Sequence, residues 1–493
     1  MTTDLPSVSS LEALEQQARN ELAVLAYPQR DWVIPVVHPS GQHVYDVVII
    51  GAGQAALGTA LALKREGVTN YLVLDKQTAG KEGVWGTFAR MSHLRTPKAT
   101  IGIDGGIPSL SAPAFYRAKY GEAAWNSIDR IERTRWMEFL SWFRQTAGIT
   151  VMNETACIGL GPEGELIRVQ IRSGSANDTS STASPMPSSL LARQVVLATG
   201  YDGCGAWRIP NAIAEKVSPV RINHSNEDID FNKFKGKRIG ILGHGASAFD
   251  NAAVAFEHGA ISVDLCFRRE QIPTINPHRR LEFAGFLKHF YELDDLTRWR
   301  TNHFFETRDQ PPTQASWDRA YLFKGFAVHS GSPWQEVAEQ EGLVRVRTPH
   351  REFEFDHLIC ATGAVVDFQA RDELRPLDAL VKRWQDVLKV APEDQSDTLG
   401  SYPYLGPGFE YLPLDASKDR WVEKIRAFNF SSIVSMGPHT TSASGHKYSI
   451  PRLVAGITSA LMAQQSAQLL PALHSFQEAE LNPQPPAFCR PQS

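Results

Sequence analysis

Two glycine-rich segments have the residue types and spacing to bind the phosphates of a dinucleotide. They are the first fingerprint, Gly51-Ala-Gly53-Gln-Ala-Ala56, and the second fingerprint, Gly243-His-Gly245-Ala-Ser247-Ala248. Each lies between an apolar run typical of a buried strand and a run of small residues typical of a helix. In this setting the first glycine permits a tight turn, and the second lets the backbone approach a pyrophosphate that binds to free N–H groups at the helix start. The chain is therefore predicted to bind two dinucleotides.

The residues after the next strand of each unit indicate which nucleotide is bound. In the first unit the strand Tyr71–Leu74 is followed by Asp75, about 20 residues after the glycines, where a carboxylate accepts the ribose hydroxyls of an adenosine; Lys76 is assigned to the same site. In the second unit the apolar run 261–267 ends at Arg268 and Arg269. Because an arginine pairs with a 2′-phosphate that a carboxylate would repel, the second site is predicted to bind NADPH rather than NADH. The alternatives are that Asp75 is an ordinary surface residue and that Arg268 and Arg269 form a solvated basic corner without a nucleotide.

The elements that position these residues predict an α/β fold with two dinucleotide-binding Rossmann-like domains. Two Ala-Thr-Gly turns, ending at Gly200 and Gly363, are interpreted as hinges, so the second domain is expected to be inserted into the first. The expected divisions are an N-terminal helix and arm (1–42), the first domain (43–204 and 356–470), the second domain (205–355) with a helical insertion at about 275–330, and a Pro-rich tail (471–493).

Four further segments receive specific predictions. The stretch 11–25 is predicted to be an amphipathic helix, serving as a cap or as an arm to another subunit. The polar stretch 173–189 is predicted to be a mobile excursion between two strands. Residues 428–437 are predicted to form a last strand and a glycine turn. A helix is expected to begin near Ile450, with Pro451 in its first turn.

Composition and charge argue against several functions. The chain of 493 residues has a net charge of −4 and a pI near 6.4, which gives no electrostatic case for nucleic acid. Since no apolar run approaches the ~20 residues of a membrane span and no signal peptide is recognised, a cytoplasmic protein is expected. The five cysteines form no Cys-x-x-Cys pair, so the dithiol of disulfide reductases is missing, and no metal site is expected.

The order of these motifs resembles that of the class B flavoprotein monooxygenases: the flavin-containing, Baeyer–Villiger and N-hydroxylating enzymes. The resemblance covers roughly residues 44–465 and rests on both fingerprints, both Ala-Thr-Gly turns and Gly83-Val-Trp85-Gly86. It implies that the first site holds FAD and the second NADPH, with Trp85, Gly200, Gly363 and Gly437 close to the cofactors. It also implies that NADPH reduces the flavin, which then forms a hydroperoxide with O₂ that must be shielded from water.

The chain departs from the family pattern at two places. The family fingerprint Phe-x-Gly-x-x-x-His falls on Ser218, Val220 and His224, so only the histidine is retained, which weakens an assignment to the Baeyer–Villiger subgroup. Arg95 stands where flavin-containing monooxygenases have an asparagine, although Lys98 matches. The stretch from residue 267 to Asn276 is similar to an insertion of the N-hydroxylating enzymes that carries an asparagine contacting substrate and nicotinamide.

Four residues are candidate catalytic groups: Arg95, Lys98, Asn276 and His224. Arg95 and Lys98 could favour the anionic reduced flavin, as could the N-terminus of the helix near residue 450, or could hold an anionic substrate. Their alternative is a pair of solvated cations. Asn276 could instead cap a helix, and His224, like His446, is either a proton donor or structural. The aromatic stripe at 279–291 is either core or a wall of the substrate pocket.

The sequence thus predicts an NADPH- and O₂-dependent flavin monooxygenase. It would insert one oxygen atom into a small molecule, at an amine nitrogen, at a sulfur or in a ketone. The alternative is an NADPH-dependent FAD reductase that passes electrons to a protein acceptor, for which this mildly acidic sequence displays no docking patch. A nucleotide-binding redox sensor is the non-enzymatic alternative, and assembly into a homo-oligomer is considered for all three.

Overall fold

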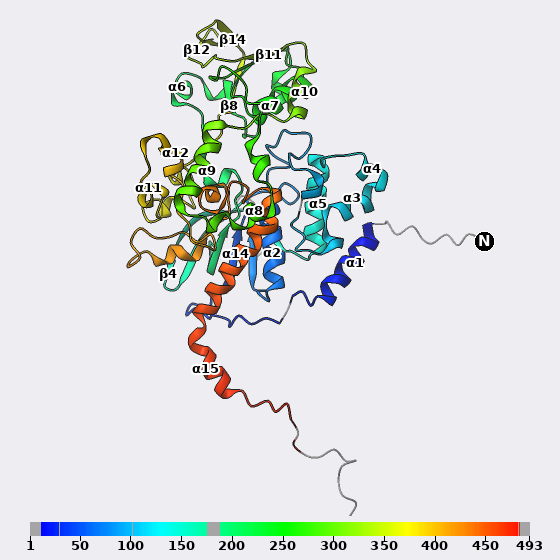
Figure 1. Cartoon of the computed structure of the whole chain (residues 1–493), viewed down its shortest axis with the longest axis vertical. Coiled ribbons are helices and arrows are strands. Elements are labelled where there is room, and N and C mark those ends of the chain that lie inside the picture. The colour runs from blue at the N-terminus through cyan, green and yellow to red at the C-terminus, as the bar shows by residue number, and fades with distance from the viewer. Residues whose placement is uncertain (1–10, 29, 101, 175–187, 482, 484–493) are drawn as a thin grey trace, which may run out of the picture.

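The molecule is built on two β-sheets with helices packed against them. A computed structural model describes residues 11–28, 30–100, 102–174, 188–481 and 483. The second sheet lies at the top of Figure 1 and the first sheet below it, with α1 at one side and α15 extending away from the body at the bottom. The mixed α/β class predicted from the sequence is confirmed.

The first sheet holds the first fingerprint. Within the described residues it has seven strands in the order β3-β2-β1-β6-β5-β4, with β17 beside β6. The core strands β1 and β6 pair in parallel, and the β4–β5 hairpin adds an antiparallel edge. The strands are β1 (Val44–Ile50), β2 (Tyr71–Leu74), β3 (Val151–Met152), β4 (Thr155–Glu163), β5 (Leu166–Ser173), β6 (Ser189–Leu197) and β17 (Ile425–Arg426).

The second sheet holds the second fingerprint. Its described strands are all parallel, in the order β11-β10-β9-β15-β8, and a small antiparallel sheet β12-β13-β14 stands beside it. The strands are β8 (Ile222–His224), β9 (Arg238–Leu242), β10 (Ser262–Cys266), β11 (Phe326–His329), β12 (Glu336–Gln340), β13 (Leu343–Arg347), β14 (Glu352–Phe355) and β15 (His357–Cys360). Parallel strands buried on both faces explain the nearly continuous apolar runs before both fingerprints.

Helices cover both sheets and fill the insertion. The insertion predicted at about 275–330 contains α8, α9 and α10, and the predicted helix at 11–25 is α1. The α-helices are α1 (Leu11–Val24), α2 (Gln54–Arg65), α3 (Ala112–Tyr120), α4 (Glu122–Asn126), α5 (Arg133–Thr146), α6 (Asn211–Ala214), α7 (Ala246–Glu257), α8 (Ala284–His289), α9 (Asp295–Arg308), α10 (Gln314–Tyr321), α11 (Trp384–Val387), α12 (Asp397–Gly400), α13 (Ile433–Met436), α14 (Ala443–Gln464) and α15 (Ser466–Ser475).

The two segments that connect the sheets pair with each other. Strand β7 (Gly205–Trp207) leads from the first sheet to the second, strand β16 (Ala364–Val366) leads back, and the two form an antiparallel ribbon. The predicted division at 355/356 is therefore wrong, because β15 lies after it and still pairs with β9 and β8 of the second sheet. The apolar run before an Ala-Thr-Gly turn does not reveal which sheet its strand belongs to.

Three local predictions also need correction. Residues 428–437 form a 3₁₀ turn and α13 instead of a strand, and the last strand of the first sheet is β17. Helix α14 begins at Ala443, capped by Ser442, so that Pro451 lies inside it. The first residues of the tail predicted from residue 471 belong to helix α15, which ends at Ser475. The predicted excursion 173–189 lies largely outside the described residues, and β5 and β6 flank it as expected.

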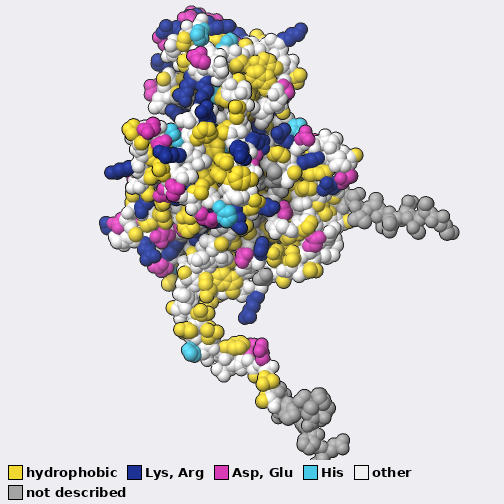
Figure 2. Space-filling view, in the orientation of Figure 1, with side chains coloured by type: hydrophobic (Ala, Val, Ile, Leu, Met, Phe, Trp, Pro, Cys, Tyr) yellow, Lys and Arg dark blue, Asp and Glu magenta, His cyan; other side chains and the backbone are white. Residues whose placement is uncertain are grey.

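The surface carries charges of both signs. Figure 2 shows Lys and Arg interspersed with Asp and Glu over the visible face, and apolar side chains on α15. Leu469, Leu470 and Leu473 of α15 are 48%, 64% and 61% exposed. In the part of the chain that the structure describes, no helix is both long enough and apolar enough to span a membrane.

The close pairing of β7 and β16 predicts that Gly205 does not tolerate a side chain. A Cβ added to Gly205 would lie 2.3 Å from the backbone nitrogen of Asp367 and from the carbonyl oxygen of Val365. We expect Gly205→Ala to lower the free energy of unfolding by about 1–3 kcal/mol, measured by urea denaturation, because the paired backbones must separate. The matched control is Gly161→Ala in β4, where nothing lies within 4 Å of the added Cβ. Equal free energies of unfolding of the two variants would show that β7 and β16 can move apart at no cost, which would contradict the prediction.

Candidate nucleotide and substrate site

A cavity of about 1040 Å³ lies at the carboxyl ends of β1 and β2 and extends toward the second sheet. Ligands of open α/β sheets bind at this end of the strands. The lining comes from the first fingerprint, the segment 81–96, the start of β4, the turn after β6 and the N-terminus of α14. It includes Gly51, Gly53, Gln54, Asp75, Lys76, Trp85, Phe88, Arg95, Gly200, Tyr201, Trp207, Phe430 and His446.

The first fingerprint turns tightly between β1 and α2. Gly51 has φ +97°, and a Cβ there would lie 2.6 Å from the carbonyl oxygen of Ala198, in the first Ala-Thr-Gly turn. Gly53 is the N-cap of α2, and no described side chain caps this helix. Ala56 is fully buried, which brings the helix close to the sheet. The exposed N–H groups and the partial positive charge of the helix start therefore suit a pyrophosphate.

The turn Gly83-Val-Trp-Gly86 lies directly on this fingerprint. A Cβ on Gly53 would be only 3.6 Å from the Cα of Gly83. The carbonyl oxygen of Trp85 accepts a hydrogen bond from Arg133, and its ring meets Trp136 edge to face at a centroid distance of 6.4 Å. Trp85 is therefore held in place as a wall of the cavity.

Asp75 connects the end of β2 to the first fingerprint. Its carboxylate accepts hydrogen bonds of 2.8 Å from the backbone N–H of Ala52 and from that of Gln77. Burial raises the pKa of Asp75, while these two N–H groups act in the opposite direction. A carboxylate has lone pairs beyond those used here, so Asp75 can also accept a ribose hydroxyl. It thus has a structural role that the sequence did not reveal.

The second fingerprint repeats the geometry of the first. Gly243 has φ +135°, and a Cβ there would lie 2.4 Å from the carbonyl oxygen of Ala361, in the second Ala-Thr-Gly turn. Gly245 is the N-cap of α7, again without a capping side chain among the described residues, and Ala248 is buried. Ser247 lies in the first turn of that helix and is half-buried.

The two arginines after β10 differ in their surroundings. Arg268 is exposed. Arg269 donates a 2.9 Å hydrogen bond to the carbonyl of Thr307 and lies 3.7 Å from the carboxylate of Asp309. Arg269 is therefore the arginine of this pair that contacts protein groups, and the sequence alone did not distinguish it from Arg268.

Arg95 and Lys98 are separated by the structure. Arg95 lines the cavity with its side chain 43% exposed, and its guanidinium lies 3.4 Å from buried Asp250 of α7. Lys98 donates to the carbonyl oxygen of Trp125 and lies 4.7 Å from the centre of that indole ring, away from the cavity lining. Only Arg95 of this pair therefore has access to a ligand in the cavity.

Asn276 and His224 both have local structural partners. The Asn276 side chain accepts a hydrogen bond from the His278 N–H and caps the 3₁₀ turn Pro277–Leu281, which is the alternative considered for it. His224 ends β8, where it is fully buried and stacks on Trp207 at 5.2 Å, and burial lowers its pKa to about 4. Neither residue lines the cavity, although Trp207 does.

The predicted cofactor glycines at the turns also fall in different places. Gly200 has φ +70° and lines the cavity. Gly363, with φ +81°, lies near Tyr201, whose hydroxyl would be 3.9 Å from an added Cβ. Gly437, with φ +117°, packs against the ring of Phe290, and it is the next residue, Pro438, that lines the cavity.

A chain of polar groups in the cavity wall was not found from the sequence. The indole N–H of Trp136 donates to Gln54 Oε1 at 3.1 Å, and Gln54 Nε2 lies 3.4 Å from His446 Nδ1. Since an indole only donates, the Gln54 amide nitrogen must face the histidine, whose proton then sits on Nε2. Burial lowers the pKa of His446 to about 4, so the imidazole is neutral at pH 7. Gln54 falls inside the first fingerprint, but its partners are distant in sequence.

Aromatic side chains form another part of the wall. Tyr201 packs on Phe430 at a centroid distance of 4.4 Å and stacks on Trp207 at 6.0 Å, and Phe88 meets Trp207 at 5.6 Å. All four line the cavity. Flat apolar faces near Arg95, which lines the cavity together with Arg172 and Arg371, suit a planar ligand with negative charge. Only Tyr201, which directly follows an Ala-Thr-Gly turn, could have been suspected from the sequence.

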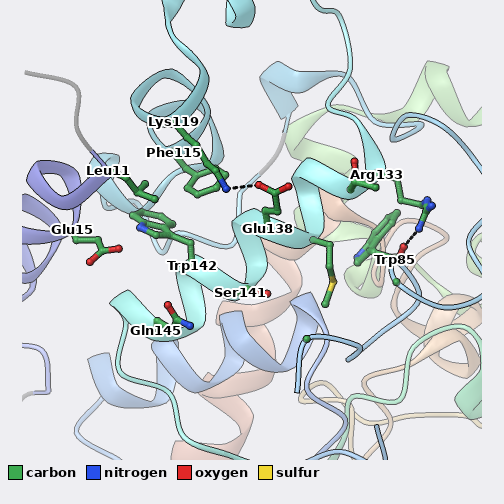
Figure 3. A pocket seen from close by; sticks show the side chains of 14 residues that line it. Leu11, Glu15, Trp85, Phe115, Lys119, Arg133, Glu138, Ser141, Trp142 and Gln145 are labelled. Carbon is green, nitrogen blue, oxygen red and sulfur yellow. Dashed lines mark hydrogen bonds and ion pairs between the residues drawn. The ribbon is translucent and has the colours of Figure 1, made fainter. Parts of the chain in front are cut away.

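A second cavity of about 510 Å³ lies on another side of Trp85. Helix α5 supplies half of its lining residues, and Figure 3 shows Leu11 and Glu15 of α1 at one end and Trp85 at the other. An ion pair between Lys119 and Glu138 crosses it. Helix α1 therefore contributes to the lining of this cavity.

Comparisons with known proteins agree with this geometry. The family model described as pyridine nucleotide-disulphide oxidoreductase matches residues 45–282, which include both fingerprints. The ornithine hydroxylase of Pseudomonas aeruginosa has a similar fold, with a TM-score of 0.65 and 16% identity, over 85% of this chain and 100% of that one. The ornithine N-hydroxylase of Kutzneria sp. 744, solved with reduced FAD, NADP⁺ and L-ornithine, has a TM-score of 0.62 and 14% identity over 84% and 99%.

A closer relative in sequence is the FAD-dependent urate hydroxylase of Xanthomonas campestris pv. campestris. It is 39% identical over 473 residues, which cover 96% of this chain and 97% of that protein. The chain belongs to the class B flavoprotein monooxygenases. It is an FAD-dependent oxidoreductase, and the family resemblance stated from the sequence is confirmed.

The residues of the larger cavity fit the FAD of this family. The first fingerprint offers an uncapped helix start for the pyrophosphate, Asp75 stands where the adenosine ribose is bound, and the cavity has the volume for a large cofactor. These are the residues of this chain that would hold it.

The tight turn at Gly51 predicts loss of the cofactor on substitution. In Gly51→Ala, a Cβ would collide with the carbonyl of Ala198 in a backbone conformation that disfavours side chains. We expect FAD to bind at least about tenfold more weakly, since a loss of about 1.4 kcal/mol already has that effect. The measurement is the flavin-to-protein absorbance ratio after gel filtration, with Gly161→Ala as control. Full flavin content in Gly51→Ala would contradict the assigned turn.

Buried histidines predict sensitivity to acid. Burial lowers the pKa of His224, His278, His357 and His446 from 6.5 to about 4. Between these pH values the unfolded chain binds protons that the folded chain does not, so the free energy of unfolding falls as the pH falls, by up to about 1.4 kcal/mol per pH unit for each histidine.

The test removes one histidine far from the larger cavity. His357 of β15 lies 2.9 Å from Asn223, and His357→Gln keeps a donor for that contact. With saturating FAD, urea unfolding across the pH window should show a shallower slope for this variant than for the parent chain. Identical slopes would mean that His357 titrates normally in the folded protein.

Proposed function

We propose that this chain is an NADPH- and O₂-dependent hydroxylase of a small, planar nitrogen heterocycle that carries a negative charge, and that urate is the first substrate to test. The observation that carries the proposal is the cavity wall of Phe88, Tyr201, Trp207 and Phe430 together with Arg95, one of the cations in the lining, whose side chain is 43% exposed. Urate is flat and anionic at neutral pH, and a relative 39% identical is a urate hydroxylase.

We further propose that the second sheet with its fingerprint is an NADPH domain inserted into the FAD domain. The paired connectors β7 and β16 and the sheet order support this arrangement. The uncapped start of α7 would bind the coenzyme pyrophosphate, and Arg268 would reach the 2′-phosphate. When bound, FAD takes hydride from NADPH and supplies the oxygen chemistry.

The chain's own residues would position and shield the reaction. The aromatic side chains would stack on the substrate ring, and Arg95 would pair with its anionic edge. Neutral His446 at the start of α14 offers an N–H donor, and the helix start adds partial positive charge beside it. The closely packed turn at Trp85 would exclude water from one side of the cavity.

The proposal is tested with isotopically labelled oxygen. The FAD-loaded protein is mixed with NADPH, urate and ¹⁸O₂, and the product is analysed by mass spectrometry. One heavy oxygen atom in the product, with NADPH oxidation that urate accelerates, is the expected result. Rapid reduction of dyes or of a protein acceptor, with no oxygen incorporated into any heterocycle, would favour the reductase instead.

Arg95 gives the matching prediction at the level of one residue. Arg95→Ala should raise KM for urate on the order of tenfold while kcat changes less, because the lost pairing orients the substrate and does not react. Arg95→Lys should recover part of the loss. The control is Arg117→Ala, whose side chain is also 43% exposed but pairs with Glu122 at the surface. An unchanged KM in Arg95→Ala would remove the arginine from the substrate site.

A further inference from the structure

An acidic residue lies between the two parts of the second fingerprint site. Asp309 directly follows helix α9 and has φ +65°. One oxygen of its carboxylate lies 3.0 Å from Nε2 of His244, which stands between the two fingerprint glycines. The same oxygen lies 3.7 Å from a guanidinium nitrogen of Arg269. Asp309 therefore bridges the pyrophosphate loop and the basic corner after β10.

This carboxylate is charged under ordinary conditions. Burial raises the pKa of Asp309, but the close approach of His244, the N–H of Gln310 and the nearby Arg269 outweigh burial, and the net pKa is lowered. The site thus presents a negative charge where a phosphate of the coenzyme would arrive. Two anions in contact with the same cation repel each other and compete for its N–H groups.

We propose that Asp309 occupies the place of the coenzyme 2′-phosphate and thereby sets how strongly this chain prefers a 2′-phosphorylated dinucleotide to an unphosphorylated one. This inference rests on the proposed use of NADPH at the second fingerprint. Arg269 donates to the Thr307 carbonyl and lies 3.7 Å from Asp309, so its remaining N–H groups can pair with a phosphate once the carboxylate moves away. NADPH binding must displace this carboxylate, whereas NADH, which lacks the phosphate, need not.

The Asp309 carboxylate can move away from His244 and Arg269. The Asp309 side chain is 44% exposed, and the residue stands in the short connection between α9 and α10, at the end of a helix. A rotation of the side chain toward solvent would free both His244 and Arg269 as donors to phosphate. Arg268, which is exposed beside them, completes the basic corner.

The test compares coenzyme binding to the FAD-loaded protein. In Asp309→Asn the amide keeps the shape of the side chain and tolerates a positive φ, but removes the charge. By calorimetry, NADP⁺ should bind on the order of tenfold more tightly than to the parent chain, while NAD⁺ affinity stays nearly the same. Asp309→Gly, which accepts the same backbone conformation, should behave alike.

Two controls assign the effect to the bridge. Asp318→Asn makes the same charge change on α10, where Asp318 accepts a hydrogen bond from Gln314 of its own helix, and should leave both affinities unchanged. Adding Arg269→Ala to Asp309→Asn should abolish most of the gain, because the released arginine is its source.

The outcomes are separable. Weaker NADP⁺ binding in Asp309→Asn, or equal changes for NADP⁺ and NAD⁺, would overturn the role of Asp309 while leaving the coenzyme site in place. If neither the parent chain nor the variants bind either coenzyme, the proposed use of NADPH fails and the inference fails with it. If NADP⁺ binds detectably only after the substitution, Asp309 is supported as the competing anion.

Discussion

The position of both fingerprints depends on one close contact that occurs twice, in which a glycine packs against the backbone carbonyl of an alanine. Gly51 lies on Ala198 and Gly243 lies on Ala361, each so close that a Cβ would come within 2.6 Å of the carbonyl oxygen. The contact joins the loop after one strand of each unit, β1 or β9, to the turn after the neighbouring strand, β6 or β15. Because both backbones are fixed there, each helix begins at the carboxyl ends of the strands of its sheet, the edge at which ligands of open α/β sheets bind.

The two units meet through polar contacts and through an apolar cluster in which Trp299 of α9 packs with Trp384 and Tyr402. The contacts between them include the Arg95–Asp250 ion pair and hydrogen bonds from Arg90 to the Glu227 carbonyl and from Arg319 to the Arg90 carbonyl. Arg95 therefore belongs both to the junction and to the cavity, and ligand charge at this residue is coupled to how the units meet.

The sequence predicted the parts of the molecule that are encoded locally. A fingerprint, the acid or arginine after the next strand, and the amphipathic helix α1 lie within short stretches, so their patterns were sufficient. What it could not provide depends on residues brought together from afar. The polar chain Trp136–Gln54–His446 joins residues nearly 400 positions apart in the sequence. Lys98 contacts Trp125 instead of the cavity, and its position in the sequence motif does not indicate this. The boundary at β15 was missed because a buried parallel strand has the same pattern in either sheet.

The antiparallel ribbon of β7 and β16 also has a meaning for how such a chain could arise and be rebuilt. Since the entry and exit of the second unit are hydrogen-bonded neighbours, that unit starts and ends at one place on the first. A short turn could close the gap if the unit were cut out, and a different nucleotide-binding module could be grafted onto the same two strands. The fold is in this sense modular, because the chain enters and leaves the second unit where Val365 pairs with Ala206.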